Sequence, residues 1–321
     1  AQQYCLLPSG GSDFHGEAKP GLDLGTGYGR FGVPCEVLTA LKKTLHTKML
    51  FTDLDGTLLD SEKAVSTSSR NAIIQMLSEG DHLVLASGRT YNSILDVLAK
   101  LDLPQKNLSG RVCLAAYNGA LLYDYDNQAV IEQYTVPIPA AQVIFDMALQ
   151  MGIHIQTYTD NCIISSAEDE EIRYYTQIIK SPYRVGTVLE EELVHAPYKL
   201  LAIALDDRSK LEALRSAFEA SAYAAEITCE FSCARYLEFY NRQAGKGNAL
   251  RNLCSALHVH IKNTVAAGDE ENDISMLRTA AVGVCMANGT PAVKAAADYV
   301  TARDNDHDGI AEVIERFVLK G

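Results

Sequence analysis

Short apolar runs alternate with amphipathic helical stretches, and this alternation constrains the fold more than any other feature of the chain. The apolar runs occupy residues 49–52, 83–86 and 112–116, and each is followed by polar or glycine-containing turns. Between them, residues 66–79 and 91–101 show the 3.6-residue period of a helix. Fully apolar strands separated by helices are typical of a parallel sheet with right-handed crossovers. The sequence therefore predicts an α/β fold with a doubly wound parallel sheet.

The middle of the chain has a different texture, in which helical stretches alternate with short strands of mixed polarity. This part covers residues 125–237, and the alternation of the first part then resumes up to the last helix. A domain whose sequence is interrupted in this way accommodates a second folding unit as an insertion. We therefore expect a catalytic core built from residues 46–124 and 238–321, with an α+β cap domain at 125–237.

Composition excludes several classes of partner. The 321-residue chain carries a formal net charge of −13, which argues against nucleic acid or an anionic membrane surface. It contains no apolar run of about 18 residues, so no membrane span is expected. The eight cysteines form no CxxC pair and no zinc-type spacing, and several lie in apolar runs. Buried reduced thiols are typical of a cytoplasmic protein, and we expect that localisation.

Two segments of the first half carry candidate chemistry. Asp53-Leu-Asp-Gly-Thr57 leaves the strand at 49–52, so its two carboxylates point the same way and can serve as nucleophile and proton carrier. Its glycine permits the turn that brings backbone amides towards a phosphate. Ser87-Gly-Arg89 follows the strand at 83–86 and offers a hydroxyl and amides at a helix start, which can bind phosphate. Either segment alone is also typical of an ordinary surface turn.

Two further segments lie in the second half. Gly245-Lys-Gly247 opens a helix, and its lysine can offset charge that develops on a phosphate, although an ordinary surface lysine would look the same. Gly268-Asp-Glu-Glu-Asn-Asp273 follows a predicted strand and places two aspartates on one side of a turn. Carboxylates are ligands that Mg²⁺ prefers, usually a few of them together with a substrate phosphate. We expect all four segments at strand ends, where ligands bind in open α/β sheets.

In this order the four segments resemble the four motifs of the haloacid dehalogenase-like (HAD) phosphatases. The matching residues are Asp53-Leu-Asp-Gly-Thr-Leu-Leu59, Ser87-Gly-Arg89, Lys246-Gly247 and Gly268-Asp-x-x-Asn-Asp273. The large insert and the phrase Val293-Lys-Ala-Ala-Ala-Asp-Tyr-Val300 resemble the Cof-type subfamily. The resemblance covers residues 48–321 and implies a Rossmann-like core with a cap.

The resemblance also implies catalytic roles. Asp53 would be the nucleophile that forms an aspartyl-phosphate, and it would also bind Mg²⁺. Asp55 would protonate the leaving group, then activate water, and give its backbone carbonyl to the metal. Lys246 would neutralise charge on the phosphate.

Binding roles follow in the same way. Asp269 would bind Mg²⁺ directly, and Asp273 would bind it directly or through water. Further residues would contact phosphate or substrate, namely Ser87, Gly88, Arg89, Asn118 and Asn272. The cap would close over the substrate and exclude water.

These expectations together predict Mg²⁺-dependent hydrolysis of a small phosphate monoester, either a sugar phosphate or a phosphorylated cofactor, through an aspartyl-phosphate intermediate. Two alternatives stay open. A sugar phosphomutase would move phosphate between positions without net release. A non-catalytic scaffold would bind metal or ligand, but it would have no need for the paired acids. The sequence identifies neither the substrate, which the shape of the cap decides, nor the oligomeric state.

Residues 1–45 have a texture of their own, rich in glycine and poor in periodic apolar residues. The stretch Gly10-Gly-Ser-Asp-Phe-His-Gly16 is similar to the closing segment of PHP-family metal phosphoesterases, in which the Asp and His are metal ligands. Only Asp13 and His15 match, and two ligands alone bind a metal weakly. We interpret residues 1–45 as the remnant of a PHP-like domain end.

Overall fold

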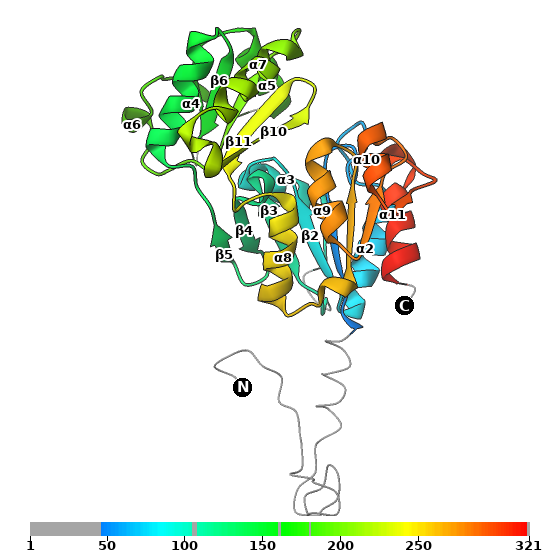
Figure 1. Cartoon of the computed structure of the whole chain (residues 1–321). Coiled ribbons are helices and arrows are strands. Elements are labelled where there is room, and N and C mark those ends of the chain that lie inside the picture. Colours follow the sequence, from blue (N-terminus) through cyan, green and yellow to red (C-terminus); the bar gives the residue numbers. More distant parts are fainter. Residues whose placement is uncertain (1–45, 105–107, 160–161, 180, 320–321) are drawn as a thin grey trace, which may run out of the picture.

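A computed structural model describes residues 46–104, 108–159, 162–179 and 181–319. Two separate sheets with their helices form two bodies, joined by two passages of the chain (Figure 1). The predicted remnant with Asp13 and His15 lies outside the described residues. Within the described ranges, no helix has the length and apolar character needed to cross a membrane.

The larger sheet has eight strands in the order β14-β13-β12-β1-β2-β3-β4-β5. Its strands are β1 (Met49–Thr52), β2 (His82–Ala86), β3 (Val112–Ala116), β4 (Leu121–Asp124), β5 (Ala129–Gln133), β12 (Thr264–Gly268), β13 (Val282–Cys285) and β14 (Tyr299–Val300). Neighbours from β14 to β3 pair in parallel, whereas β4 and β5 extend the sheet antiparallel. The strand order reverses between β1 and β12, which confirms the predicted doubly wound α/β fold and locates its ligand-binding edge.

Helices cover both faces of this sheet. They are α2 (Thr67–Glu79), α3 (Tyr91–Leu101), α8 (Lys246–Leu257), α9 (Ile274–Thr279), α10 (Pro291–Ala296) and α11 (Gly309–Val313), the last continuing as a π-helical turn at Ile314–Val318. Because side chains alternate along a strand, Leu50 packs with α2, α3 and α11, whereas Met49 and Phe51 pack with α8, α9 and α10. The Ser66 hydroxyl caps the start of α2, and Gly80 with φ 99° ends it.

The smaller sheet has six strands in the order β10-β11-β9-β6-β7-β8. They are β6 (His154–Tyr158), β7 (Ile163–Ser165), β8 (Tyr183–Val185), β9 (Lys199–Ile203), β10 (Ile227–Cys233) and β11 (Tyr236–Asn241). Helices α4 (Ile138–Gln150), α6 (Leu189–Glu192) and α7 (Arg208–Glu219) pack on one face, and α5 (Glu170–Ile179) packs on the other. On β9, Leu200 faces the first group, and Leu201 faces α5.

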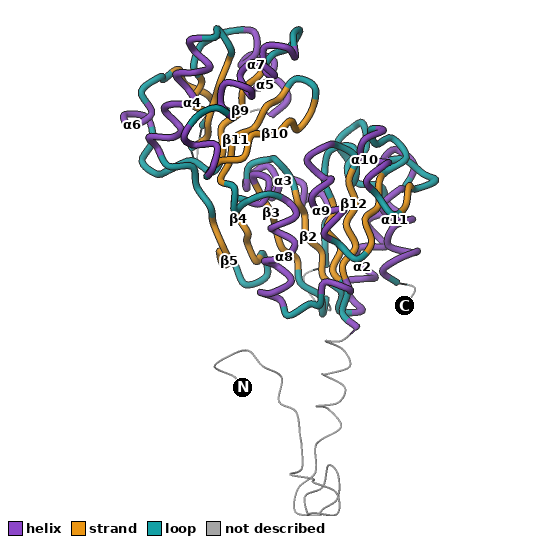
Figure 2. Tube along the Cα trace, in the orientation of Figure 1, coloured by secondary structure: helices purple, strands orange, loops and turns teal. Residues whose placement is uncertain are grey.

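The two passages between the sheets lie later in the chain than the expected boundaries at 125 and 237. Strand β5 pairs with β4 in the larger sheet, and β11 pairs with β9 in the smaller one (Figure 2). The Asn241 side-chain amide donates a hydrogen bond to the Thr135 carbonyl at 3.0 Å, so the passages run side by side. We therefore propose that the cap spans the chain between these passages, residues 134–243, and that the rest of the described chain is the core.

Candidate active site

The segment that follows β1 is anchored on β12. The Asp53 amide donates to the Ala267 carbonyl at 2.9 Å, and the Thr57 hydroxyl donates to Asp269 Oδ1 at 2.7 Å. Between them, Gly56 has φ +79°, a conformation that residues with a Cβ rarely adopt. Burial leaves only 7% of Asp53 exposed. The Asp-x-Asp-Gly-Thr segment therefore folds into a tight loop whose first carboxylate is held at the switch point of the sheet.

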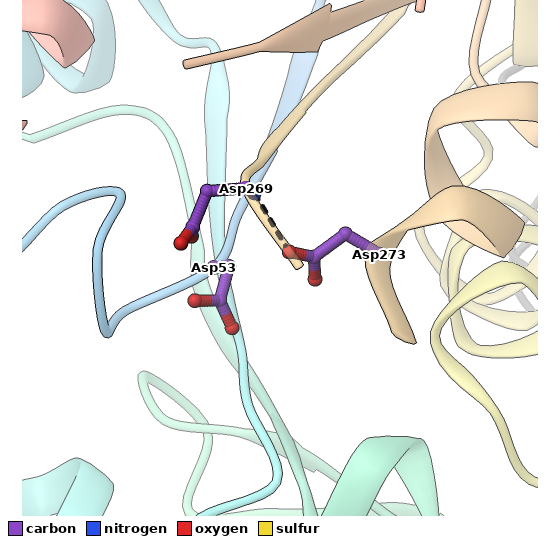
Figure 3. Close-up of side chains that lie close together, drawn as sticks. All are labelled: Asp53, Asp269 and Asp273. Atoms are coloured by element: carbon purple, nitrogen blue, oxygen red, sulfur yellow. Dashed lines mark hydrogen bonds between the residues drawn. The ribbon is translucent and has the colours of Figure 1, made fainter. Parts of the chain in front are cut away.

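Three carboxylates converge at this point, as Figure 3 shows. One oxygen from each of Asp53, Asp269 and Asp273 lies within 4.8 Å of the others. Asp269 follows β12, and Asp273 ends the short 3₁₀ helix Glu271–Asp273. Asp273 Oδ2 accepts hydrogen bonds from the backbone amides of Asp269 at 2.9 Å and Glu270 at 3.1 Å, which fix its orientation. Hard oxygen atoms so arranged suit a cation such as Mg²⁺.

Lys246 forms ion pairs with two of these carboxylates. Its Nζ lies 2.6 Å from Asp53 Oδ1 and 2.5 Å from Asp273 Oδ1, and only 1% of the side chain is exposed. It begins α8, which the chain reaches through the turn that follows the end of β11 in the smaller sheet. This turn, at residues 242–245, returns the chain to the core, where the Gly245 amide bonds the Asn118 carbonyl at 2.8 Å.

The electrostatics of this cluster favour a bound cation. Burial, together with the charges of Asp273 and Asp269, raises the pKa of Asp53. Burial and the Asp273 charge raise the pKa of Asp269 to about 7. Burial would lower the pKa of Lys246, but the charges of Asp273 and Asp53 outweigh it and raise that pKa. Three acids thus face one cationic side chain, and the excess negative charge is what a divalent ion relieves.

Asp55 lies beside the cluster but has different partners. Arg89 binds both its oxygens, with Nε at 2.6 Å and an NH2 contact at 2.7 Å, and Lys63 Nζ lies 2.7 Å from Oδ1. Burial would raise the pKa of Asp55, but the hydrogen bonds and charges of Arg89 and Lys63 outweigh it and lower the pKa to about 2. The two carboxylates of the Asp-x-Asp pair are therefore placed in environments that shift their pKa values in opposite directions.

The predicted phosphate contacts fall into two groups, namely those that line the cavity and one buried residue that contacts them. Ser87, Gly88, Arg89 and Asn272 line the cavity above Asp53. The Ser87 hydroxyl accepts a hydrogen bond from the Arg89 amide at 3.2 Å. Asn118 is not among the described residues that line this cavity. It is 1% exposed, and its Oδ1 accepts from the Asn272 side-chain amide at 3.4 Å. Asn118 is thus placed to position Asn272.

An ion pair of the cap reaches this site, and sequence analysis missed it. Lys199 Nζ on β9 lies 2.8 Å from Glu238 Oε2 on β11 and donates to the Gly88 carbonyl at 2.6 Å. Glu238 also accepts from the Asn118 amide at 2.8 Å. Both charged side chains are buried. The signal was a lysine and a glutamate inside otherwise apolar strands, because buried charges persist only when they are paired.

Residues of the core and the cap line a cavity of about 450 Å³ over Asp53 and Asp269. Asp53, Asp55, Ser87 and Asp269 contribute its core side. Helix α5 and strands β9, β10 and β11 contribute the cap side. This volume is in the range of small-molecule sites and suits a metabolite of one or two rings.

Replacing Gly56 with alanine should lower activity more than the strain of a left-handed backbone conformation alone would. A Cβ there would overlap the Asp269 carboxylate. We expect stability to fall by roughly 1–2 kcal/mol and catalytic activity to fall at least tenfold. Gly152→Ala is the matched control, because Gly152 has φ +65° with nothing within 4 Å of its Cβ position. Equal activity losses in the two variants would contradict the assigned clash.

Comparisons with known proteins agree with this geometry. The family model of the haloacid dehalogenase-like hydrolases matches residues 50–314. Pyridoxal phosphate phosphatase YbhA of Escherichia coli is 30% identical over 279 residues, covering 84% of this chain and 98% of that protein. The 5-amino-6-(5-phospho-D-ribitylamino)uracil phosphatase YwtE of Bacillus subtilis is 25% identical, covering 84% and 98%.

A solved structure has a similar fold over most of the chain. The haloacid dehalogenase-like hydrolase from Bacteroides thetaiotaomicron superposes with a TM-score of 0.73 and 28% identity, covering 84% of this chain and 99% of that one. The matches extend over both sheets described above and confirm the resemblance drawn from the four motifs. The chain belongs to the haloacid dehalogenase-like hydrolase family, and it is a phosphatase of that family.

Proposed function

We propose that the chain hydrolyses a small phosphate monoester, a sugar phosphate or a phosphorylated cofactor, with Mg²⁺ bound at Asp53, Asp269 and Asp273. The observation that carries this proposal is the position of Asp53, whose carboxylate lies at the floor of a metabolite-sized cavity between Lys246 and two further acids. Relatives named for pyridoxal phosphate and for a ribitylaminouracil phosphate support a small phosphorylated metabolite as substrate.

The proposed reaction has two steps. In the first, Asp55 takes a proton from solvent once the phosphate has drawn Arg89 and Lys63 away from it. An oxygen of Asp53 then attacks phosphorus, the bond from phosphorus to the ester oxygen breaks, and Asp55 gives its proton to the departing oxygen. In the second, Asp55 takes a proton from water, the water oxygen attacks the aspartyl-phosphate, and phosphate leaves with Asp53 restored. Bound Mg²⁺ would supply charge neutralisation at the phosphoryl oxygens.

The remaining residues bind and orient the phosphate. Lys246 neutralises charge on it, while the Ser87 hydroxyl and the Asn272 amide face the same cavity. Arg89 and Lys63 hold Asp55 in the absence of substrate. An incoming phosphate dianion competes for these two cations, which frees Asp55 to face the ester oxygen. The ion pairs of Asp55 with these cations, outside the cluster of Asp53, Asp269 and Asp273, support its assignment to proton transfer rather than to metal binding by its side chain.

A panel of phosphorylated metabolites tests the proposal by orthophosphate release in the presence of Mg²⁺. A hydrolase releases phosphate stoichiometrically with the alcohol. A sugar phosphomutase, the rival enzyme, would interconvert positional isomers with no net release. A scaffold without turnover would do neither. Absence of release across the panel would reject the proposed function.

Metal dependence gives a second test. EDTA should silence the wild-type protein, and Asp269→Ala should raise the Mg²⁺ concentration for half-maximal activity at least tenfold, because one of three converging carboxylates is lost. Glu271→Ala is the matched control, since Glu271 is an exposed acid two positions away. Full activity in EDTA, or equal Mg²⁺ requirements for the two variants, would refute the assigned metal site.

A further inference from the structure

The cap side of the catalytic cavity is aromatic and aliphatic. Helix α5 and strands β9 and β11 contribute Tyr174, Tyr175, Ile178, Ile179, Leu201 and Tyr236 to its lining. The rings of Tyr175 and Tyr236 meet edge to face, with centroids 6.0 Å apart. Ile178, which belongs to the same lining, is 50% exposed. This wall faces the position that the alcohol part of a bound phosphate ester would occupy.

The polar groups on the same side are few and mostly paired with each other. Lys199 donates to Glu238 and to the Gly88 carbonyl. The Tyr175 hydroxyl bonds the Tyr158 hydroxyl at 2.8 Å. Among the described residues of the cap wall, Ser232 has a buried hydroxyl oxygen with no hydrogen-bond partner. The wall therefore offers wide apolar surface, and its hydrogen-bonding groups are the Lys199–Glu238 pair, the Ser232 hydroxyl and the hydroxyls of its tyrosines.

A sugar leaving group fits this wall poorly. It carries a hydroxyl on almost every carbon, and each hydroxyl that loses water without a new partner costs binding free energy. A flat ring with one or two polar substituents has the opposite needs, since its faces stack on tyrosine and leucine side chains and its substituents require few partners. A cavity of about 450 Å³ holds such a single ring together with its phosphate.

Resting on the proposed phosphatase function, we propose that the preferred substrate carries a planar aromatic or heteroaromatic ring on its alcohol part, and that Tyr236 is a residue that determines this preference. Tyr236 lies on β11 two positions before Glu238, so both side chains project from the same face of the strand into the cavity. Its partly exposed ring packs against Tyr175 and presents its other surface to the ligand.

Two substrates of matched chemistry test the proposal. Pyridoxine 5′-phosphate and glucose 6-phosphate are both monoesters of primary alcohols, so the bond that breaks is the same and the ring is the difference. Pyridoxine 5′-phosphate lacks an aldehyde and therefore forms no imine with Lys63 or Lys199. We expect kcat/KM for pyridoxine 5′-phosphate to exceed that for glucose 6-phosphate at least tenfold. An equal or reversed ratio, with phosphate still released, overturns this inference and leaves the proposed function intact.

Variants assign the preference to the ring of Tyr236. Tyr236→Leu should lower kcat/KM for pyridoxine 5′-phosphate about tenfold, a loss in the range of an aromatic pair, and change the glucose 6-phosphate value by less than twofold. Tyr236→Phe keeps the ring and should keep the preference. Tyr125→Leu is the control for loss of a tyrosine elsewhere, because Tyr125 is an exposed residue of the core domain. An unchanged substrate ratio in Tyr236→Leu would show that this ring plays no part.

Equilibrium binding separates failure of this inference from failure of the proposed function. Binding of pyridoxine 5′-phosphate to the Asp53→Asn protein is followed by the fluorescence of the ligand, and binding of glucose 6-phosphate is measured by competition against it. We expect pyridoxine 5′-phosphate to bind at least tenfold more tightly. This readout needs no turnover. Tighter binding of the ring compound supports the inference even where phosphate release fails, and equal binding overturns it.

Discussion

Replacing Asp53 with asparagine should lower kcat for phosphate release by far more than a hundredfold and leave the protein folded. An amide has no negative charge to attack phosphorus, so the covalent route closes. A hundredfold loss corresponds to about 2.7 kcal/mol of barrier, and loss of the nucleophile should exceed that. The buried cluster keeps its fold because Lys246 retains Asp273 as a partner at 2.5 Å.

Steady-state phosphate release and thermal melting measure the two halves of this prediction. Asp96→Asn, the same substitution at an exposed position of α3, should behave as wild type in both. Residual activity above one hundredth of wild type in folded Asp53→Asn would remove Asp53 from the role of nucleophile.

Lys246→Met should be the most destabilising substitution at the site as well as inactivating. Methionine has similar length but no charge, so Asp53 and Asp273 would remain buried without their cation. Breaking a buried pair in this way costs roughly 3–5 kcal/mol. The expected fall in Tm is about 10 °C for a domain of this size. Loss of charge neutralisation at the phosphate should also lower kcat at least a hundredfold.

Magnesium distinguishes this electrostatic cause from a simple packing defect. Since a bound divalent cation relieves the same repulsion, Mg²⁺ should raise the Tm of Lys246→Met more than that of the wild type. Lys210→Met, at an exposed position of α7, should change neither Tm nor its Mg²⁺ response. A normal Tm for Lys246→Met in the absence of metal would contradict the assigned role of the ion pairs.

The parts that could be predicted from sequence are those that depend on local pattern. Strand β1 is apolar up to Thr52 and buried on both faces, so its run of residues identifies it without knowledge of its neighbours. The same run places Asp53 at a strand end. Strand β5 was assigned to the cap because its mostly exposed residues lack the apolar pattern of the other core strands. Exposed edge strands carry little sequence signal, which is why the cap boundary proposed here, after β5, differs from the boundary expected at residue 125.

Contacts between distant segments could not be predicted in the same way. Lys199 and Gly88 are 111 positions apart, and no local pattern indicates that they meet. The partners of Asp55 were equally hidden, because Arg89 comes from the loop after β2 and lies 34 positions away. Each of the four motifs is short and contiguous, so the sequence predicts it directly. The cap wall of the cavity is instead assembled from four elements, whose relation depends on the fold of the cap.

The adjacency of the two passages between core and cap has a consequence for the order of folding. Thr57 and Asp269 must meet across 212 positions of chain, but Thr135 and Asn241, 106 positions apart, are joined where the cap begins and ends. A cap that folds first therefore shortens the loop that the core must close to about half. Each doubling of loop length costs about 0.6 kcal/mol of closure entropy. If the cap folds first, the core should therefore assemble roughly threefold faster. Early folding of the inserted unit thus brings the two halves of the catalytic sheet close together and speeds their pairing.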